Sequence, residues 1–308
     1  MTHTVAVTGS AAALRGVSFG ALLYLAALGE MITEKAGILN LGVEGMMITG
    51  AVVGFAIGVN TGSSWAGFAT AAVAGAVLSM IFAVITQVLL SNQVATGLGL
   101  TLFGLGLSSL IGKPYVGIKA PGFSKLDIPI LSDIPVLGPI LFRHDPMVYV
   151  SLFLVAAVWY LLTYTRAGLV LRAVGENHSA AHALGYKVVR VRFMAIAFGG
   201  AMAGLGGAYV SLVRVPQWVE GMTSGAGWIA LAIVVFASWR PWRILLGAYL
   251  FGGITVLQLN LQAAGSTIPV EYLSMSPYLV TILVLVIISV RGNHGAPGSL
   301  GRVFHASH

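Results

Sequence analysis

Residues 33–51 read Thr-Glu-Lys-Ala-Gly-Ile-Leu-Asn-Leu-Gly-Val-Glu-Gly-Met-Met-Ile-Thr-Gly-Ala, and they are the most informative part of the chain. It places the carboxylate of Glu44 four residues after Asn40, at the mouth of a long apolar run. The whole chain has only nine acidic residues among 308. Because a carboxylate against hydrocarbon is costly, a membrane protein places one in its interior, in a water-filled cavity or at an interface. The stretch therefore predicts a membrane helix that begins beside a sheltered acid.

The composition of the chain is that of an integral membrane protein. Hydrophobic residues make up 57%, charged residues 8%, and the mean hydropathy is +0.93, whereas a soluble domain carries about 25% charged residues. We expect an all-α, polytopic helical bundle in which residues 1–308 form a single transmembrane domain without a soluble catalytic domain. Zero cysteines exclude disulfides, thiolate metal sites and cysteine nucleophiles. Residues 1–14 lack the basic start of a secretory signal, so we expect the first apolar run to be kept as a span.

The apolar runs are long enough for about nine membrane-spanning helices, with eight to ten compatible with the pattern. The predicted spans are 15–33, 37–59, 64–90, 93–112, 147–165, 192–213, 225–239, 242–262 and 276–291. The count depends on 37–59 and 225–239, because each of these runs could be broken or shortened. Glycines at a spacing of four, such as Gly50 and Gly54 or Gly200 and Gly204, favour close helix packing in lipid.

Basic residues predict the orientation of the helices. The loop at about 166–192 carries five basic residues against one acid, so the positive-inside rule places it in the cytoplasm. The loop at about 113–146 then lies outside, and so does the N-terminus if there are nine spans. That external loop holds six of the eleven prolines, which prevent a continuous helix. The net charge of +7 is explained by this topology and by anionic inner-leaflet lipid, and it requires no nucleic acid.

The cytoplasmic loop contains a second informative pattern at residues 165–185. Asn177 or Ser179 can cap a short helix, because their side chains accept hydrogen bonds from free backbone N–H groups. Gly185 suits the C-terminal end of such a helix. Alanines give this helix a smooth surface that could seat in a groove of a partner protein; they are Ala180, Ala181 and Ala183.

Both stretches resemble permease subunits of bacterial ABC importers, in the nucleoside and simple-sugar branch of the branched-chain permease superfamily. Residues 36–47 carry the pattern A-G-x-x-N-x-G-x-E-G-M-M of that branch. Residues 172–185 carry its pattern R-A-x-G-E-N-x-x-A-A-x-x-x-G, with Ser179 at the position where the general coupling pattern E-A-A-x-x-x-G has a glutamate. The resemblance covers nearly the whole chain from about residue 20.

The resemblance implies a permease subunit of an ATP-driven importer for nucleosides or simple sugars, in the bacterial plasma (inner) membrane. It implies a second homologous permease chain, a cytoplasmic ABC ATPase that binds ATP and Mg²⁺, and an extracytoplasmic solute-binding protein. No P-loop motif occurs, so we expect neither enzyme activity nor a cofactor in this chain. The residues implied to couple the chain to the ATPase are Arg172, Gly175, Glu176, Asn177, Ala180, Ala181 and Gly185.

Polar residues near the spans are candidates for the transport pathway or its gate, and interhelical hydrogen bonding is the alternative for each. The candidates are Asn40, Glu44, Gln93 and Trp228. If Asn40 marks the cytoplasmic mouth, Glu44 lies about 6 Å deeper along a helix. There it would face the inner vestibule, the second permease chain or an adjacent helix, with water or Lys35 keeping it ionised. His178 and His182 are four residues apart, but without further ligands we expect no metal site.

Two other functions fit parts of the pattern. The same machine could carry a branched-chain amino acid or another small polar solute. A secondary transporter driven by an ion gradient would need a relay of acids or histidines inside the membrane. The chain offers only Glu30 and Glu44 for such a relay, and the coupling-type loop would then have no explanation.

Overall fold

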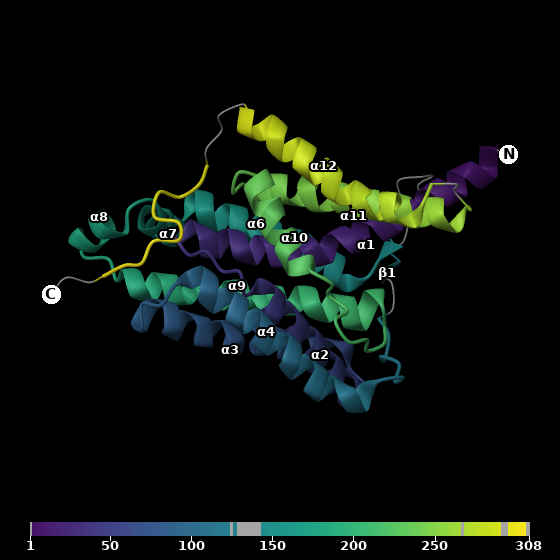
Figure 1. The fold of residues 1–308 in the computed structure, drawn as a ribbon, viewed down its shortest axis with the longest axis horizontal. Helices are drawn as coiled ribbons and strands as arrows, with labels where there is room; N and C mark the ends of the chain where they lie inside the picture. The colour runs from purple at the N-terminus through teal and green to yellow at the C-terminus, as the bar shows by residue number, and fades with distance from the viewer. Residues whose placement is uncertain (1, 124–125, 128–142, 266–267, 291–294, 306–308) are drawn as a thin grey trace.

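The computed structural model describes residues 2–123, 126–127, 143–265, 268–290 and 295–305. Its long helices run roughly along the long axis of the molecule (Figure 1). They are α1 (Thr2–Lys35), α2 (Val43–Thr61), α3 (Ser64–Ala83), α4 (Gln93–Gly112), α6 (Pro146–Tyr164), α7 (Arg166–Glu176), α8 (His178–Ala183), α9 (Val188–Tyr209), α10 (Ala226–Phe236), α11 (Pro241–Ala263) and α12 (Val270–Val290). Short π-helical turns η1 (Val84–Val88) and η3 (Val210–Arg214) extend α3 and α9, and a 3₁₀ turn η2 (Lys113–Tyr115) extends α4.

The only strands in the described parts of the chain are β1 (Leu126–Asp127) and β2 (Arg143–His144). They pair antiparallel, with Leu126 opposite His144 and Asp127 opposite Arg143. Most of the predicted external loop, residues 124–125 and 128–142, lies outside the described residues. The part that is described lies at the end of the molecule opposite to α8 (Figure 1).

The structure confirms a polytopic helical membrane bundle. Seven helices are long and apolar enough to cross a membrane among the described residues, and two apolar helices are shorter, Ala226–Phe236 and Val270–Val284. All nine predicted spans therefore correspond to helices. The 11 residues of α10 reach about 16 Å, roughly half of a ~30 Å hydrocarbon core. As expected for one of the two doubtful runs, α10 is a half-length helix.

The other doubtful run is also shortened. The prediction of a helix from residue 37 was wrong, because α2 begins only at Val43. Gly37 has a φ of +85°, which turns the chain out of α1 and is strained for other residues. The side chain of Asn40 then accepts a hydrogen bond from the Gly42 N–H at 2.9 Å, and such a local turn competes with helix. Residues 36–42 therefore form a non-helical segment between α1 and α2.

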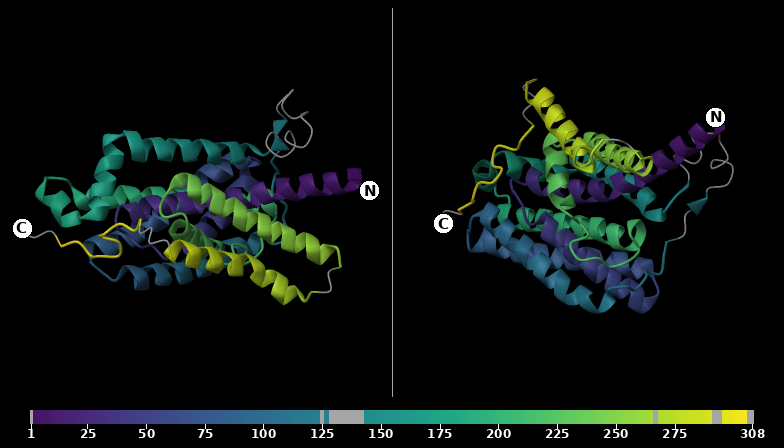
Figure 2. Two further views of the ribbon diagram at one scale, coloured as in Figure 1. Left: turned by 90° about the horizontal axis from the view of Figure 1, so that it is seen from above. Right: turned by 45° about the vertical axis from the view of Figure 1, so that its right-hand side comes forward.

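The bundle has two sides that share α1 and α9. α9 packs on α1, α2 and α3, while α1 also packs on α10 and α11. Figure 2 shows α11 and α12 stacked together on the side away from α3 and α4. Helices approach closely where glycines face one another, as Gly50 faces Gly204 and Gly75 faces Gly200. The predicted role of these glycines in packing is confirmed by these contacts.

We predict that Gly204→Ala destabilises the bundle by about 2 kcal/mol, because overpacking forces neighbouring helices apart. A Cβ at Gly204 would overlap the carbonyl oxygen of Ala71 on α3. Thermal unfolding of the purified protein measures the effect. Gly106→Ala is the matched control on α4, because a Cβ there meets nothing within 4 Å. Equal melting temperatures for the two variants would contradict the prediction.

Candidate functional site

Two non-helical segments enter the bundle from opposite ends and meet inside it. Residues 36–42 run back along α4, where the hydroxyl of Thr101 donates to the carbonyl of Leu41 at 3.1 Å. Residues 215–225 come from the other end, where the carbonyl of Pro216 accepts from the N–H of Ala120 at 2.9 Å. The indole N–H of Trp228, just after the second segment, donates to Leu41 O at 3.3 Å. We call this meeting point, residues 40–45 and 223–228, the central junction.

Glu44 joins the two halves of the central junction. It is only 3% exposed, and one carboxylate oxygen accepts from the Thr223 hydroxyl at 2.6 Å and from the Gly225 N–H at 2.9 Å. The other oxygen accepts from the Gly227 N–H at 2.7 Å. These N–H groups lie at the start of α10, while Glu44 itself lies in the first turn of α2. One carboxylate therefore complements the positive ends of two helix dipoles.

Glu44 lies well inside the bundle. Its neighbour Gly45 packs against Leu100 and Thr101, which follow the first residue of α4 by seven and eight positions. At 1.5 Å per residue this is about 11 Å along α4. The helical rise assumed between Asn40 and Glu44 does not apply, because α2 begins only at Val43. The donors that Glu44 uses come from residues 223–227 and not from Lys35.

Asn40 and Gln93 hold the first segment in place. Both are buried, at 1% and 3% exposure. The N–H of Asn40 donates to Glu30 Oε1 at 3.2 Å, and the N–H of Leu39 donates to Gln93 Oε1 at 2.9 Å. The structure thus gathers the predicted pathway candidates around one junction, but it gives these two side chains backbone partners. Only Trp228, at 46% exposure, presents a large surface away from the core.

Several exposed residues lie on the segment that leads from the end of the molecule carrying η2 to Trp228. Glu220, Ser224 and Trp228 are exposed at a spacing of four. Glu220 Oε1 accepts from the hydroxyl of Ser109 on α4 at 2.5 Å. We call these four residues the polar strip. Only Trp228 was predicted from the sequence. Glu220 and Ser224 lie in a glycine-rich turn, where a spacing of four does not predict a shared face, and Ser109 gave no signal of its own.

The predicted coupling loop forms α7 and α8. Asn177 Oδ1 accepts from the Ala180 N–H at 3.0 Å, so Asn177 rather than Ser179 caps α8. Gly185 follows with a φ of +87°, and its N–H donates to the carbonyl of His182 at 2.8 Å. Both ends of the short helix therefore have the geometry that the sequence indicated.

The predicted alanine surface of α8 is correct only in part. Ala180 and Ala183 are exposed, whereas Ala181 is 3% exposed and packs with Val174, Val188 and Phe304. Ala181 therefore faces its own chain and cannot touch a partner directly. The large apolar groups that α8 and its end present are Leu184 and Tyr186, at 78% and 41% exposure. We call the exposed residues Ala180, Ala183, Leu184 and Tyr186 the docking surface.

The C-terminal tail, residues 295–305, clamps this loop. The Ser299 N–H donates to Gly175 O at 2.8 Å, and the Gly301 N–H donates to Gly37 O at 3.1 Å. Gly175 lies so close to the carbonyl of Lys35 that a Cβ would overlap it. Arg172 and Glu176 are exposed. Among the predicted coupling residues, Gly175 thus has a packing role, while these two charged side chains point away from the core.

Arg192 connects the coupling loop, the C-terminal tail and residues 36–42. It is fully buried, and it donates to Ala36 O at 3.2 Å and to Arg302 O at 3.3 Å. A third nitrogen lies 3.2 Å from Nδ1 of His178 at the start of α8. Burial and the charges of Arg192 and Arg302 lower the pKa of His178, so the imidazole is neutral at pH 7 and accepts this hydrogen bond. Arg192 therefore links the first residue of α8 directly to Ala36.

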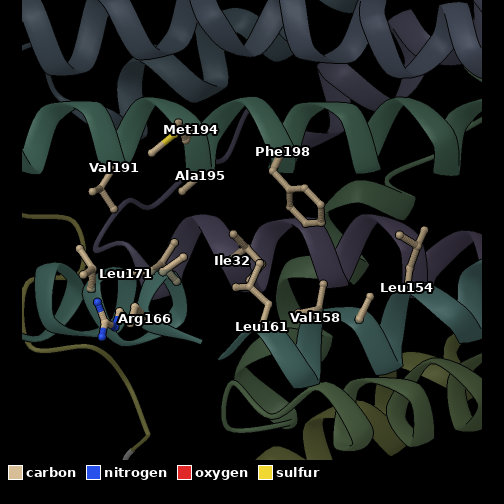
Figure 3. A pocket seen from close by; sticks show the side chains of 13 residues that line it. Ile32, Leu154, Val158, Leu161, Arg166, Leu171, Val191, Met194, Ala195 and Phe198 are labelled. Atoms are coloured by element: carbon tan, nitrogen blue, oxygen red, sulfur yellow. The ribbon is translucent and has the colours of Figure 1, made fainter. Parts of the chain in front are cut away.

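An apolar groove of about 520 Å³ lies between α1, α6, α7 and α9 (Figure 3). Figure 3 shows Phe198 of α9 and Leu161 of α6 pointing into it, with Arg166 at one side. Its walls offer almost no hydrogen-bonding groups, so it does not suit a polar solute. Among the described residues, no three His, Asp or Glu side chains lie together as metal ligands. His178 and His182 instead pack edge-on against Phe304.

Comparisons with known proteins give a consistent result. Residues 12–288 match the family described as "Branched-chain amino acid transport system / permease component". The chain is 42% identical over 291 residues to "Putative glucose ABC transporter permease protein TsgC13" of Haloferax volcanii, covering 87% of this chain and 88% of the relative. It is 34% identical over 284 residues to guanosine ABC transporter permease protein NupQ of Bacillus subtilis, with 87% and 88% covered.

A third relative is nucleoside ABC transporter permease protein NupC of Lactococcus lactis, which is 31% identical over 276 residues, with 85% of this chain and 87% of the relative covered. No solved structure matches the chain. The family match spans most of the chain, including the central junction and the coupling loop. The chain therefore belongs to the family of branched-chain amino acid transport system permease components, as a multi-pass membrane subunit of an ABC importer that is not itself an enzyme.

Proposed function

We propose that this chain forms half of the pathway by which an ATP-driven importer carries a nucleoside or a simple sugar across the plasma membrane. Three relatives that are at least 31% identical to this chain are named for glucose, guanosine and nucleosides. The polar strip carries the proposal within this chain, because an exposed indole can stack on a base or a sugar face. The carboxylate of Glu220 and the hydroxyl of Ser109 can bind the hydroxyl groups of either solute.

A branched-chain amino acid is the second candidate, because the family description names that solute class. It would use the polar strip differently. An aliphatic side chain gains little from stacking on indole, and none of the four residues of the polar strip is a cation that could pair with the α-carboxylate. The strip therefore favours an uncharged, hydroxyl-rich solute. An ion-gradient mechanism is set aside, because the family couples transport to ATP.

We propose three protein partners for this subunit. A cytoplasmic ATPase, which binds ATP and Mg²⁺, would seat on the docking surface of α8. A solute-binding protein would deliver solute at the opposite end. A second permease chain would complete the pathway: Haloferax volcanii has two glucose permease relatives of this chain, TsgC13 and TsgB13, and Bacillus subtilis has two guanosine permease relatives, NupQ and NupP. The relatives come from an archaeon and from bacteria, so we propose a prokaryotic plasma membrane without choosing between them.

We predict that Trp228→Ala raises the KM for solute uptake about fivefold, because stacking on an aromatic face contributes roughly 1 kcal/mol. Trp228→Phe keeps an aromatic face and should stay within about twofold of wild type. The measurement is uptake of radiolabelled guanosine, glucose and leucine by proteoliposomes that hold the assembled importer.

Trp65→Ala is the matched control, because Trp65 is 54% exposed on α3 and lies outside the polar strip. It should leave the KM unchanged. Transport of leucine alone would contradict the proposed solute class. An unchanged KM in Trp228→Ala would show that the pathway does not pass the polar strip.

A further inference from the structure

A second cavity, of about 490 Å³, opens where α6 and α7 meet the turn between α10 and α11. Its walls come from the last residue of α1, the end of α6, one residue of α7 and the first residues of α11. Four of the lining residues are cations and three are tryptophans: Lys35, Arg172, Arg240, Arg243, Trp159, Trp239 and Trp242. We call it the basic pocket. It is separate from the central junction and from the docking surface of α8.

The four cations of the basic pocket have no carboxylate partner in the part of the chain that the structure describes. No salt bridge within 4 Å involves any of them, and Arg172 donates only to the backbone carbonyl of Gly168, at 3.4 Å. Lys35 lies within electrostatic reach of two further cations, Arg172 and Arg240, and of Glu176. A second nearby acid, Glu34, accepts a hydrogen bond from the indole N–H of Trp239. The four converging cations outnumber these two acids, and such an excess of positive charge attracts an anion.

The position of the basic pocket is fixed by the ends of three spans. α1 ends at Lys35, α6 ends at Tyr164, and α11 begins at Pro241. The pocket therefore lies at the level of the membrane–water interface, on the same side as the coupling loop. Trp159 and Trp242 stand with ring centroids 6.4 Å apart, and Trp159 and Tyr164 are 5.3 Å apart. Tryptophan and tyrosine gather at the headgroup level of membranes.

We propose that the basic pocket binds the phosphate-bearing headgroup of an anionic phospholipid from the cytoplasmic leaflet. The positive-inside rule explains why basic residues follow spans, but it does not require them to converge on one cavity beside three tryptophans. Basic pockets between helices on the cytoplasmic side suit such headgroups. The lipid would link the cytoplasmic ends of α1, α6 and α11 next to Arg172 of α7, which leads into α8.

The test uses the full chain in the assembled importer, reconstituted in nanodiscs of phosphatidylcholine with a small fraction of phosphatidylglycerol. Native mass spectrometry after mild extraction counts the phosphatidylglycerol that remains bound. The double variant Arg240→Gln, Arg243→Gln should lose bound phosphatidylglycerol by about 30-fold, because each basic residue near an anionic surface contributes roughly a fivefold gain in affinity. The charge-preserving variant Arg240→Lys, Arg243→Lys should retain most of it.

The matched control is Lys187→Gln, Arg190→Gln, which removes the same charge from exposed residues before and within α9. It should retain bound phosphatidylglycerol, and an equal loss there would overturn the proposal in favour of general surface charge. Inorganic phosphate in excess should not displace the lipid, and displacement would assign the pocket to a free anion. Loss of the ATPase subunit from the double variant in pure phosphatidylcholine would assign it to a protein interface. Unchanged lipid binding in the double variant would also overturn the proposal.

Discussion

Glu44→Ala should abolish uptake and lower the melting temperature of the assembled importer by about 10 °C. The change removes the acceptor of three hydrogen bonds at once. Two of their donors are backbone N–H groups at the start of α10, which have no intrahelical partner. Losing hydrogen bonds to a charged, buried acceptor costs roughly 4 kcal/mol here, and about 10 °C follows for a protein of this size. Thermal unfolding and proteoliposome uptake measure the two effects.

Glu44→Gln separates charge from shape at the same position. An amide offers one acceptor oxygen, but its NH₂ group would face a backbone donor of α10 and could not replace the second carboxylate oxygen. We therefore expect an intermediate melting temperature and uptake well below wild type. Glu271→Gln is the matched control, because Glu271 is exposed in the first turn of α12. Wild-type stability and uptake in both Glu44 variants would show that the junction does not depend on this carboxylate.

Leu184→Asp should reduce ATP-driven uptake by at least about 30-fold while the protein still folds and inserts. Leu184 is 78% exposed at the end of α8, so its replacement disturbs little within the chain. An apolar anchor at the centre of an interface typically contributes about 2 kcal/mol or more to binding. The measurement is co-purification of the ATPase with the permease, followed by uptake in proteoliposomes.

Two controls define the result for Leu184. Leu184→Met keeps the apolar surface and should retain both the ATPase and uptake. Val116→Asp introduces the same charge at a residue that is 66% exposed at the opposite end of the molecule, and it should still co-purify with the ATPase. If Leu184→Asp retains the ATPase at wild-type levels, the docking surface has been placed on the wrong face of α8.

The spans were predictable because each rests on a local property, the length of an apolar run. The segment 36–42 was not, because Ile38, Leu39 and Leu41 are as apolar as a helix would require. Hydropathy measures the environment of a residue and not its backbone conformation. The partners of Glu44 were also beyond local reasoning, since Thr223 and Gly227 lie 179 and 183 residues further along the chain.

The coupling loop also combines features that local sequence predicts with features that depend on distant residues. Its caps depend on backbone geometry within one turn, and the sequence predicted Gly185 as one of them and offered Asn177 or Ser179 as the other. Which face of α8 is free depends on Phe304, more than 120 residues later, so the buried position of Ala181 had no local signal. The basic residues predicted an orientation, but only the fold shows that Arg192 is buried and joins three segments.

The clamp on α8 by residues 295–305 has a consequence for biosynthesis. The ribosome makes the coupling loop before α9, α10, α11 and α12, and it makes the clamp after all of them. Until then Ala181 and Val188 lack the packing of Phe304, and Gly175 lacks its partner Ser299. The coupling loop of a nascent chain therefore stays incompletely packed until residues 295–305 have been made.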